Sequence, residues 1–280
     1  MTVIALTGAH GRLGSRLRGP LADCAEALVC CDLVDDIGPL HPKERYQKAD
    51  VAELDQMLDL LQGVDTVVHF AAIVDEAPFE KLLGPNFIGA YNVWEAAYRC
   101  GVKRVVYASS IHAVGMYPRT QYIDADVPHR PDTFYGLAKC FAEDLARMYH
   151  DKRGIEAVCL RILSCAAVNN ERALGTWLSY DDLVELVLRS VETPVVGFTI
   201  VYGVSANDRA PVDNAKASFL GYRPKDNAEE FAEDILPTAP PVDPQDPARH
   251  CQGGPFASVP LGEGIVGQMN IVDEDQQSQG

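Results

Sequence analysis

The stretch "TGAHGRLG", Thr7 to Gly14, directly follows the apolar run "VIAL" and carries three glycines in the spacing G-x-x-G-x-x-G. Glycine lets the backbone turn tightly and lets another group approach the main chain closely. Where such a turn joins a strand to a helix, its amide groups and the helix N-terminus can hold the pyrophosphate of a dinucleotide. Glycine triplets also occur in ordinary loops, so the surrounding sequence must decide between a nucleotide site and a structural turn.

The rest of the chain alternates between strand and helix patterns, which predicts a parallel sheet with helical crossovers. We therefore predict an α/β fold, a Rossmann-type doubly wound parallel sheet of about seven strands. The expected strands are 3–7, 26–32, a short one ending at 50, 65–72, 103–110, 156–162 and 197–203, and the expected helices start at about 12, 51, 86, 134 and 180.

The domain organisation follows from a change of composition near residue 237. Residues 1–236 are expected to form one Rossmann domain with an integrated substrate pocket. Residues 237–280 contain seven prolines and little periodicity. We predict that they form a small, irregular, acidic C-terminal extension on the substrate side, with a disordered tip at "VDEDQQSQG".

Composition excludes several classes of protein. The chain has 280 residues, 47% of them hydrophobic, and no apolar run near the ~18 residues of a membrane-spanning helix. Its N-terminus "MTVIALTG" enters a strand without a basic region or cleavage site, so no signal peptide and no membrane association are expected. The eight cysteines form no C-x-x-C pair and no metal-ligand spacing with histidine. Free thiols, no metal and a cytoplasmic location are therefore predicted.

The formal net charge of −16 is concentrated near the C-terminus, where residues 226–280 hold eleven acidic residues against one basic residue. Nucleic acid is not expected as a partner, because phosphates must be met by Lys and Arg. The chain has only eight lysines against sixteen arginines. A protein kept soluble at high salt and a moderately acidic mesophilic protein both remain consistent with this surface.

The residues around the glycine turn predict NAD as the cofactor. Asp32 ends the second strand, where a carboxylate accepts the hydroxyls of the adenosine ribose. No basic residue follows before Lys43, so a 2′-phosphate would be repelled and NAD is favoured over NADP. Asp50 can face the adenine amino group, and the small Ala71 and Ala72 let the cofactor pass over the fourth strand. The alternative is a structural turn in which Asp32 caps a helix.

The expected chemistry lies in "FYGLAK", where Tyr135 and Lys139 are four residues apart and share one helical face. An ammonium beside a phenol stabilises the phenolate, so we expect Lys139 to lower the pKa of Tyr135 toward the range of a general base. Ser109 and Ser110 lie at the carboxyl end of the fifth strand, where ligands bind in such sheets. Ser110 can there hydrogen-bond the substrate hydroxyl that Tyr135 deprotonates.

At these residues the chain resembles the uronate dehydrogenases, a family of the extended short-chain dehydrogenase/reductase (NAD-dependent epimerase/dehydratase) superfamily. The resemblance covers nearly the whole chain, and its later motifs are more specific than the glycines. They are "YASSIHAVGMYP", "RPDTFYGLAKCFAEDLARMY", "NNERALGTWLSYDD", "GVSAND" and "GYRPKDNAE". The resemblance implies oxidation of hexuronic acids such as glucuronate and galacturonate at C1, with NAD, to an aldaric acid lactone. We also expect a homo-oligomer.

The resemblance implies roles for single residues. Tyr135 is the base, Lys139 its partner and the holder of the nicotinamide ribose, and Arg172 binds the carboxylate. The expected catalytic residues are Tyr135, Lys139 and Ser110. The expected cofactor-binding residues are Gly8, Gly11, Arg12, Leu13, Gly14, Asp32, Asp50, Val51, Ala71, Ala72, Ser109, Tyr135, Lys139 and Cys165. The expected substrate-binding residues are Val74, Ser110, Ile111, His112, Tyr135, Ser164 and Arg172.

Several of these roles have structural alternatives. His112 can be an ordinary loop histidine, Cys165 a packing cysteine, and Arg172 a surface arginine paired with Glu171 or with an acidic residue of the C-terminal tail. Ile111 and Val74 stand where the family usually carries an asparagine and a serine, so two polar contacts to the sugar are missing. This affects discrimination between epimeric uronates and leaves the catalytic assignment unchanged.

The sequence disfavours two other functions that this type of fold can carry. Nucleotide-sugar epimerases follow the sixth strand with an Asn and a Tyr-Gly-Pro element, which "LRILSCAAVNNERA" lacks, and dehydratases need an Asp-Glu pair that "SSIHAV" lacks. A non-catalytic NAD-sensing Rossmann protein typically loses the Tyr–Lys pair, which this chain keeps.

Overall fold

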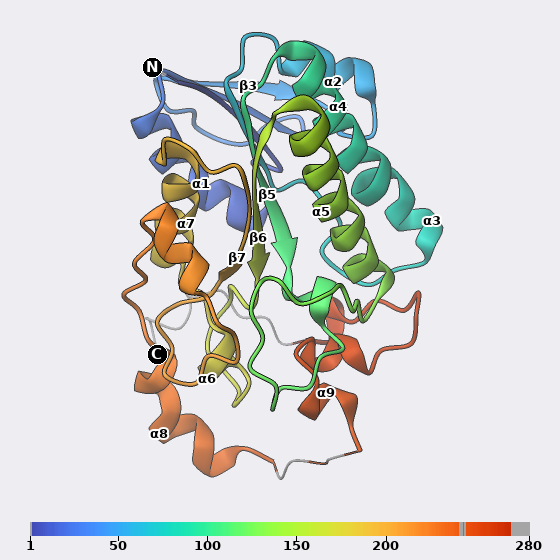
Figure 1. The fold of residues 1–280 in the computed structure, drawn as a ribbon, viewed down its shortest axis with the longest axis vertical. Coiled ribbons are helices and arrows are strands. Elements are labelled where there is room, and N and C mark those ends of the chain that lie inside the picture. The colour runs from blue at the N-terminus through green and yellow to red at the C-terminus, as the bar shows by residue number, and fades with distance from the viewer. Residues whose placement is uncertain (1, 241–242, 244, 270–280) are drawn as a thin grey trace.

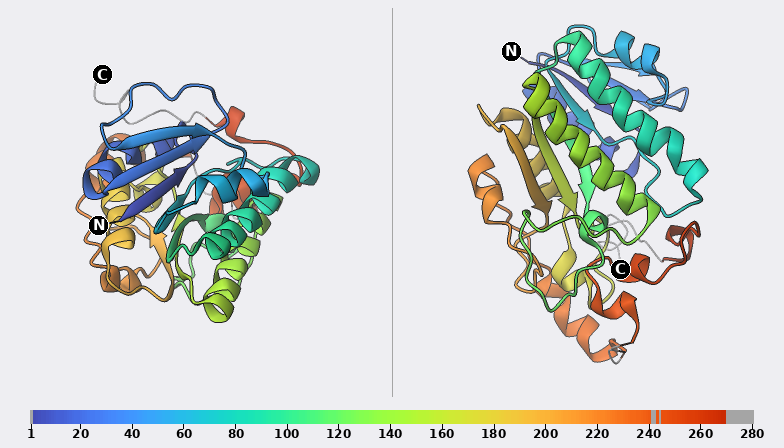
Figure 2. Two further views of the ribbon diagram at one scale, coloured as in Figure 1. Left: turned by 90° about the horizontal axis from the view of Figure 1, so that it is seen from above. Right: turned by 45° about the vertical axis from the view of Figure 1, so that its right-hand side comes forward.

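The strands form one parallel sheet of seven strands in the order β3-β2-β1-β4-β5-β6-β7. Figures 1 and 2 show this sheet between its helices. The computed structural model describes residues 2–240, 243 and 245–269. The order reverses at β1, which pairs with β2 on one side and β4 on the other. The strands are β1 Val3–Thr7, β2 Ala27–Asp32, β3 Glu44–Lys48, β4 Thr66–His69, β5 Arg104–Ser110, β6 Glu156–Ile162 and β7 Phe198–Gly203. The predicted doubly wound α/β fold is confirmed.

Helices cover both faces of the sheet, with α1 and α7 on one face and α2, α4 and α5 on the other (Figure 1). The inner strands are mostly apolar runs because both of their faces are buried, whereas the edge strand β3 is polar and partly exposed. The longer helices are α1 Arg12–Cys24, α2 Leu54–Leu60, α4 Gly89–Cys100, α5 Phe134–Arg153 and α7 Tyr180–Glu192. The short ones are α3 Phe79–Leu82, α6 Ala173–Thr176, α8 Ala232–Ile235 and α9 Pro247–His250.

Local sequence explains where the main helices begin and end. Both α4 and α5 end at a glycine in the left-handed region, Gly101 and Gly154, a conformation that costs other residues more. Thr133 caps the start of α5 by accepting a hydrogen bond from the Gly136 N–H, and Ser179 caps α7 in the same way. These caps fix the point at which the two helices leave the sheet.

A buried ion pair ties the strands together at their amino ends. Arg104 opens β5 and Glu156 opens β6, and Arg104 Nε lies 3.0 Å from Glu156 Oε2. The same guanidinium donates to the carbonyls of Ser190 and Val191 at the end of α7. The other oxygen of Glu156 accepts from the Val196 N–H. This end of the sheet is therefore closed by polar contacts within the protein.

The C-terminal segment, defined here as residues 245–269, packs against the long loop that follows β5. Pro118 and Cys251 form an antiparallel bridge, and the N–H of Gln252 donates to the carbonyl of Tyr117 at 2.8 Å. In Figure 1 this segment (red) lies below the carboxyl ends of the central strands, beside the N-terminus of α5. The prediction of a disordered tip concerns residues 272–280, which lie outside the described residues.

The helix expected from residue 86 differs at its start. A π-helical turn over Leu83–Ile88 precedes α4, and Pro85 within it cannot donate a backbone hydrogen bond. The side chain of Asn86 exchanges two hydrogen bonds of 2.9 Å with the backbone of Ile73 in the loop after β4. This tertiary contact favours the wider turn.

None of the helices in the described ranges has the length and apolar character needed to cross a lipid bilayer.

Candidate active site

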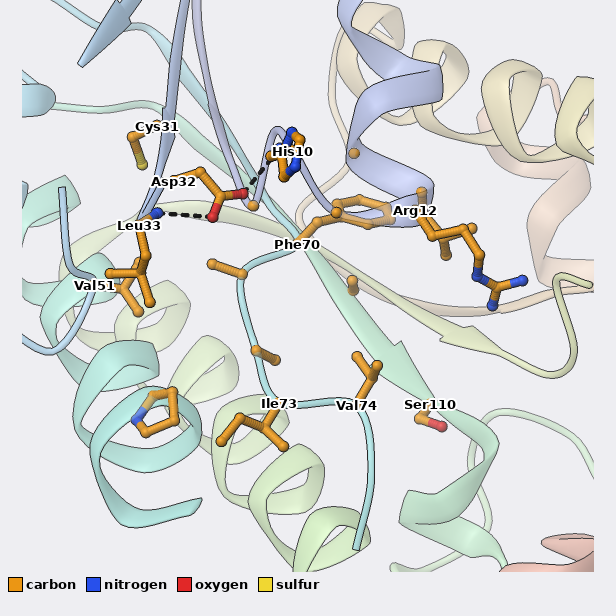
Figure 3. Close-up of a pocket in the computed structure, with 18 of the residues that line it drawn as sticks. His10, Arg12, Cys31, Asp32, Leu33, Val51, Phe70, Ile73, Val74 and Ser110 are labelled. Atoms are coloured by element: carbon orange, nitrogen blue, oxygen red, sulfur yellow. Dashed lines mark hydrogen bonds between the residues drawn. The ribbon is translucent and has the colours of Figure 1, made fainter. Parts of the chain in front are cut away.

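A cavity of about 440 Å³ opens at the carboxyl ends of the strands, beside the point where the strand order reverses (Figure 3). Ligands of doubly wound sheets bind at this position. The loops after β1, β2, β3, β4 and β6, the carboxyl end of β5 and the N-terminal turns of α1 and α5 contribute to its wall. The volume lies within the ~300–1,000 Å³ range of small-molecule sites.

The glycine turn is built so that no side chain fits at its centre. Gly8 has φ of +74°, and a Cβ there would lie 2.7 Å from the backbone nitrogen of Ala71. A Cβ on Gly14 would lie 2.0 Å from the carbonyl oxygen of Gly8, so α1 can approach β1 only with glycine at this position. The resulting cradle of backbone N–H groups at the N-terminus of α1 fits a pyrophosphate.

Asp32 lies at the end of β2 with its carboxylate held toward the cavity. Its Oδ2 accepts a hydrogen bond from the His10 N–H at 2.9 Å and its Oδ1 one from the Leu33 N–H at 2.7 Å (Figure 3). The remaining lone pairs can accept the two hydroxyls of a ribose. Asp32 holds the backbone of the turn before α1 and does not cap the helix itself, whose N-cap Gly11 receives no side-chain hydrogen bond.

Tyr135 and Lys139 meet Ser110 at the far end of the cavity. Both side chains come from the first turns of α5, and Ser110 ends β5. Lys139 Nζ donates to the carbonyl of Ala108 at 2.7 Å and lies 5.3 Å from the centre of the Tyr135 ring. The phenol of Tyr135 is hydrogen-bonded to Ser110. The three groups predicted to carry the chemistry are thus brought together.

Burial dominates the acidity of this pair. It raises the pKa of Tyr135 to about 12, while the hydrogen bond to Ser110 acts in the lowering direction. It lowers the pKa of Lys139 to about 7, while the charge of Glu143 one turn further along α5 acts to raise it. The expectation that Lys139 lowers the pKa of Tyr135 is corrected, because desolvation penalises both charged forms.

Sequence reasoning missed the buried polar cluster behind these residues. Glu143 accepts from Ser109 Oγ at 2.5 Å, from Arg161 Nη2 at 2.7 Å and from His129 Nε2 at 2.8 Å. Ser109 lines the cavity, but its hydroxyl is committed to Glu143. No short motif marks such a cluster, because its members come from β5, the following loop, α5 and β6.

His112 and Ile111 follow Ser110 but point in different directions. His112 Nδ1 lies 2.7 Å from Asp132 Oδ2, and its ring packs on Phe256 with 4.1 Å between ring centres and on Tyr135 with 5.7 Å. It is therefore a fixed residue beside the expected base. Ile111 is fully buried in a separate apolar cluster with Ile123. Its side chain does not reach the cavity, and the prediction that it lines the substrate is corrected.

Arg172 is a half-buried side chain whose Nε atom is buried and whose guanidinium is only partly satisfied. Nη2 donates to the carbonyl of Gln252 at 2.8 Å, while Nε has no hydrogen-bond partner within the described part of the chain. Burial lowers its pKa to about 10, with the nearby Arg119 acting in the same direction. Glu171 pairs with Arg249 instead, at 3.2 Å. The alternative of a surface arginine paired with Glu171 is therefore wrong.

All fourteen predicted cofactor-binding residues line the cavity, and among the predicted substrate-binding residues Val74, Ser110 and Tyr135 do so too. Ser164 is half-buried next to the lining residue Cys165 and pairs with Trp177. Arg172 and His112 lie outside the lining, toward the C-terminal segment. The sequence also gave no signal for Phe256, because its contacts with His112 and Tyr135 depend on how the C-terminal segment folds back.

Comparisons with known proteins agree with this geometry. A model of the NAD dependent epimerase/dehydratase family matches residues 4–177. The chain is 45% identical over 262 residues to the uronate dehydrogenase of Agrobacterium fabrum, covering 93% of this chain and 98% of the relative. A mutant uronate dehydrogenase from Agrobacterium tumefaciens complexed with NAD superposes with a TM-score of 0.87 at 45% identity, covering 93% and 98% of the two chains. Glucuronic acid dehydrogenase from Chromohalobacter salexigens gives a TM-score of 0.88 at 42% identity, covering 92% and 97%.

Proposed function

The chain belongs to the NAD dependent epimerase/dehydratase family and, within it, to the uronate dehydrogenases, and we propose that it oxidises hexuronic acids such as glucuronate and galacturonate at C1 to the aldaric acid lactone, with NAD. The observation that carries this proposal beyond the family is a cavity suited to a dinucleotide together with a half-buried, partly satisfied arginine, Arg172, which lies outside the cavity lining toward the C-terminal segment.

The residues of the cavity fit NAD. The glycine cradle leaves room for a pyrophosphate, and Asp32 presents its free lone pairs where an adenosine ribose would lie. The lining residues beside Asp32 are Leu33 and His10, and Arg12 lies on the other side of the turn (Figure 3). No lysine or arginine of the lining therefore stands next to Asp32 to pair with a 2′-phosphate, which is disfavoured. NAD⁺ held by these residues would supply the acceptor for the hydride of C1, and its positive charge would favour the ionised phenol.

The protein's own groups handle the proton. Tyr135 takes the proton of the C1 hydroxyl, which becomes the carbonyl of the lactone as C1 loses a hydride. Ser110, hydrogen-bonded to the phenol, orients that hydroxyl. When its amine is protonated, Lys139, held by the carbonyl of Ala108, offsets part of the cost of burying the phenolate that accepts this proton.

Arg172 is the proposed holder of the substrate carboxylate. A guanidinium binds a carboxylate through two parallel hydrogen bonds, which would fix the far end of the sugar and aim C1. The unsatisfied Nε supports this role, because a buried donor without a partner is costly unless a ligand supplies one.

The proposed function is tested by following NADH formation with glucuronate, galacturonate and glucose, each with NAD and with NADP. Turnover of both uronates with NAD, and little turnover of glucose or with NADP, is expected. Absence of NADH with every uronate would contradict the proposal.

The role of Arg172 has its own test, the Arg172→Ala variant. Loss of charged hydrogen bonds worth about 1.5–3 kcal/mol each should lower kcat/KM for uronates by roughly 10²–10⁴. The Arg172→Lys variant should keep only part of the wild-type kcat/KM, because a point charge cannot make two parallel hydrogen bonds. The Kd of NAD should change little in either variant. An equal fall of kcat/KM for the residual oxidation of glucose would show that Arg172 has a structural role.

We further propose a homo-oligomer in the cytoplasm. Large apolar side chains lie exposed at helical spacing on α4 (Tyr91 and Tyr98) and on α5 (Leu137, Phe141 and Met148). A second copy of the chain that covers this face would remove them from water. The cysteines in the described ranges are free thiols, consistent with a reducing compartment. The mass of the protein in solution tests this proposal: it should be a multiple of the chain mass in the wild type and should decrease in Phe141→Glu.

A further inference from the structure

Glu76 is a buried carboxylate that joins three separate parts of the chain. It is 1% exposed and lies in the loop after β4, two residues past the cavity-lining Val74. Its Oε2 accepts a hydrogen bond of 3.0 Å from the backbone N–H of Tyr135, in the first turn of α5. Its Oε1 accepts one of 2.7 Å from the backbone N–H of Gly262, in the C-terminal segment.

Both bonds use groups that favour a negative charge. The Tyr135 N–H is one of the orphan donors at the start of α5, where the helix dipole attracts an anion. Gly262 has φ of +86°, a conformation suited to glycine, which lets its N–H face the carboxylate. Two backbone donors and a helix N-terminus thus compensate a charge that is removed from water.

The same junction positions the aromatic side chains at the substrate end. Tyr135 and Phe256 pack with Leu82 in one apolar cluster, to which Ile265 and Val266 also contribute. The Phe256 ring lies 4.1 Å from His112 and 6.2 Å from Tyr135, measured between ring centres. Displacement of the C-terminal segment would therefore move the surroundings of the phenol.

We propose that Glu76 is a positioning residue for the oxidation: its carboxylate locks the backbone of Tyr135 and the C-terminal segment to one another, and so sets the place of the phenol relative to the sugar. The role rests on the proposed function of Tyr135. It acts on the chemical step rather than on cofactor binding, because both bonds lie at the substrate end. A misplacement of about 1 Å can lower a rate by about 10².

The neighbouring Asp75 provides a matched control. Its Oδ1 accepts from the N–H groups of Ile265 at 2.9 Å and Val266 at 3.1 Å, so it anchors the same segment. The contacts of Asp75 do not extend to the backbone of Tyr135 in the described structure. The same Oδ1 accepts a hydrogen bond of 2.8 Å from the backbone N–H of Glu76, so Asp75→Ala loosens the segment and the backbone at Glu76 but leaves both bonds of the Glu76 carboxylate in place. Glu76→Gln instead disturbs the link between the segment and α5, since its amide nitrogen faces one of the two N–H donors.

Two measurements test the proposal. Hydrogen exchange of the protein alone should show at least about tenfold faster exchange of the Tyr135 or Gly262 amide in Glu76→Gln. In Asp75→Ala, faster exchange is expected at the three amides that Asp75 accepts from, those of residues 76, 265 and 266, and not at Tyr135. Single-turnover NADH formation with glucuronate should slow about tenfold or more in Glu76→Gln and stay within about threefold in Asp75→Ala. The Kd of NAD should stay within about threefold in both.

The outcomes separate this proposal from the proposed function. A folded Glu76→Gln with unchanged amide exchange, or with an unchanged single-turnover rate, overturns the positioning role. If Glu76→Gln does not fold, Glu76→Asp replaces it, because its shorter carboxylate cannot keep both bonds at their present lengths. If the wild-type enzyme oxidises no uronate, the proposed function fails, and the exchange measurement alone decides whether Glu76 locks the two segments.

Discussion

A single oxygen atom, the phenol oxygen of Tyr135, carries the proposed proton transfer. Replacing Tyr135 with Phe keeps the ring and its contacts with His112 and Phe256 but removes the proton acceptor. Turnover should fall by about 10²–10⁴, as expected for loss of a general base. Steady-state NADH formation and the Kd of NAD measure the two effects, and the Kd should hardly change. More than about a tenth of wild-type kcat would mean that another group is the base.

At this scale the sequence predicted residues whose roles depend on short spacings. The glycine turn, Asp32 at a strand end and the Tyr135–Lys139 pair are local patterns, and all of them line the cavity. Glu76 and Phe256 gave no such signal, because each acquires its contacts only when segments more than fifty residues apart meet. The pKa of Tyr135 was also unpredictable, since burial is a property of the fold.

Among the elements, the junction of β1 and α1 leaves very little room for a side chain. A Cβ on Gly14 would lie 2.0 Å from the backbone oxygen of Gly8, so Gly14→Ala must push α1 away from β1. We expect this to weaken NAD binding by about tenfold or more and to lower the free energy of unfolding by about 1–3 kcal/mol. Ser15→Ala, at the exposed next residue, is the control and should change neither by more than about 0.5 kcal/mol. Calorimetry measures the affinity for NAD, and urea unfolding measures the free energy of unfolding. Normal NAD binding by Gly14→Ala would contradict the argument that α1 must approach β1 closely.

Glu143 links α5 to β6 and makes stability depend on pH. Burial acts to raise its pKa, but hydrogen bonds from His129 and Arg161 outweigh burial and hold it at about 2, below the ordinary 4.5. A lowered folded-state pKa stabilises the protein fully above pH about 4.5, and this contribution, about 3 kcal/mol, is lost as the pH falls toward 2. In urea unfolding, the advantage of the wild type over Glu143→Gln should therefore be constant from pH 7 to 5 and narrow below about 4.5. If the difference in unfolding free energy between the wild type and Glu143→Gln stays constant down to pH 3, the lowered pKa of Glu143 is contradicted.

The elements that could be predicted from the sequence are those whose boundaries are set locally. The strands are apolar runs, and α4 and α5 stop at Gly101 and Gly154, as expected from a glycine after a helical pattern. The π-helical turn before α4 could not be predicted, because it depends on the contact between Asn86 and Ile73. The packing of the C-terminal segment was missed for the same reason.

Across the whole molecule, the formal net charge of −16 opposes an anionic substrate. Salt screens the exposed charges strongly and a buried pair such as Arg172 with a carboxylate much less. Between about 0.02 M and about 0.5 M NaCl, kcat/KM for glucuronate should therefore rise by about two- to fivefold. Residual oxidation of the neutral sugar glucose is the control and should be insensitive to this range. A fall of kcat/KM with salt would show that exposed positive charge guides the substrate instead.

The two ends of the sheet carry different tasks. Arg104 and Glu156 close the amino ends with polar contacts, while the cavity lies at the carboxyl ends, a full strand length away. Because substitutions this far apart contribute to stability almost additively, changes at the closed end have little means of disturbing the geometry of the cavity. Evolution, or a protein engineer, can therefore adjust the heat tolerance of this enzyme at one pole and its choice of sugar at the other, with little trade-off between the two.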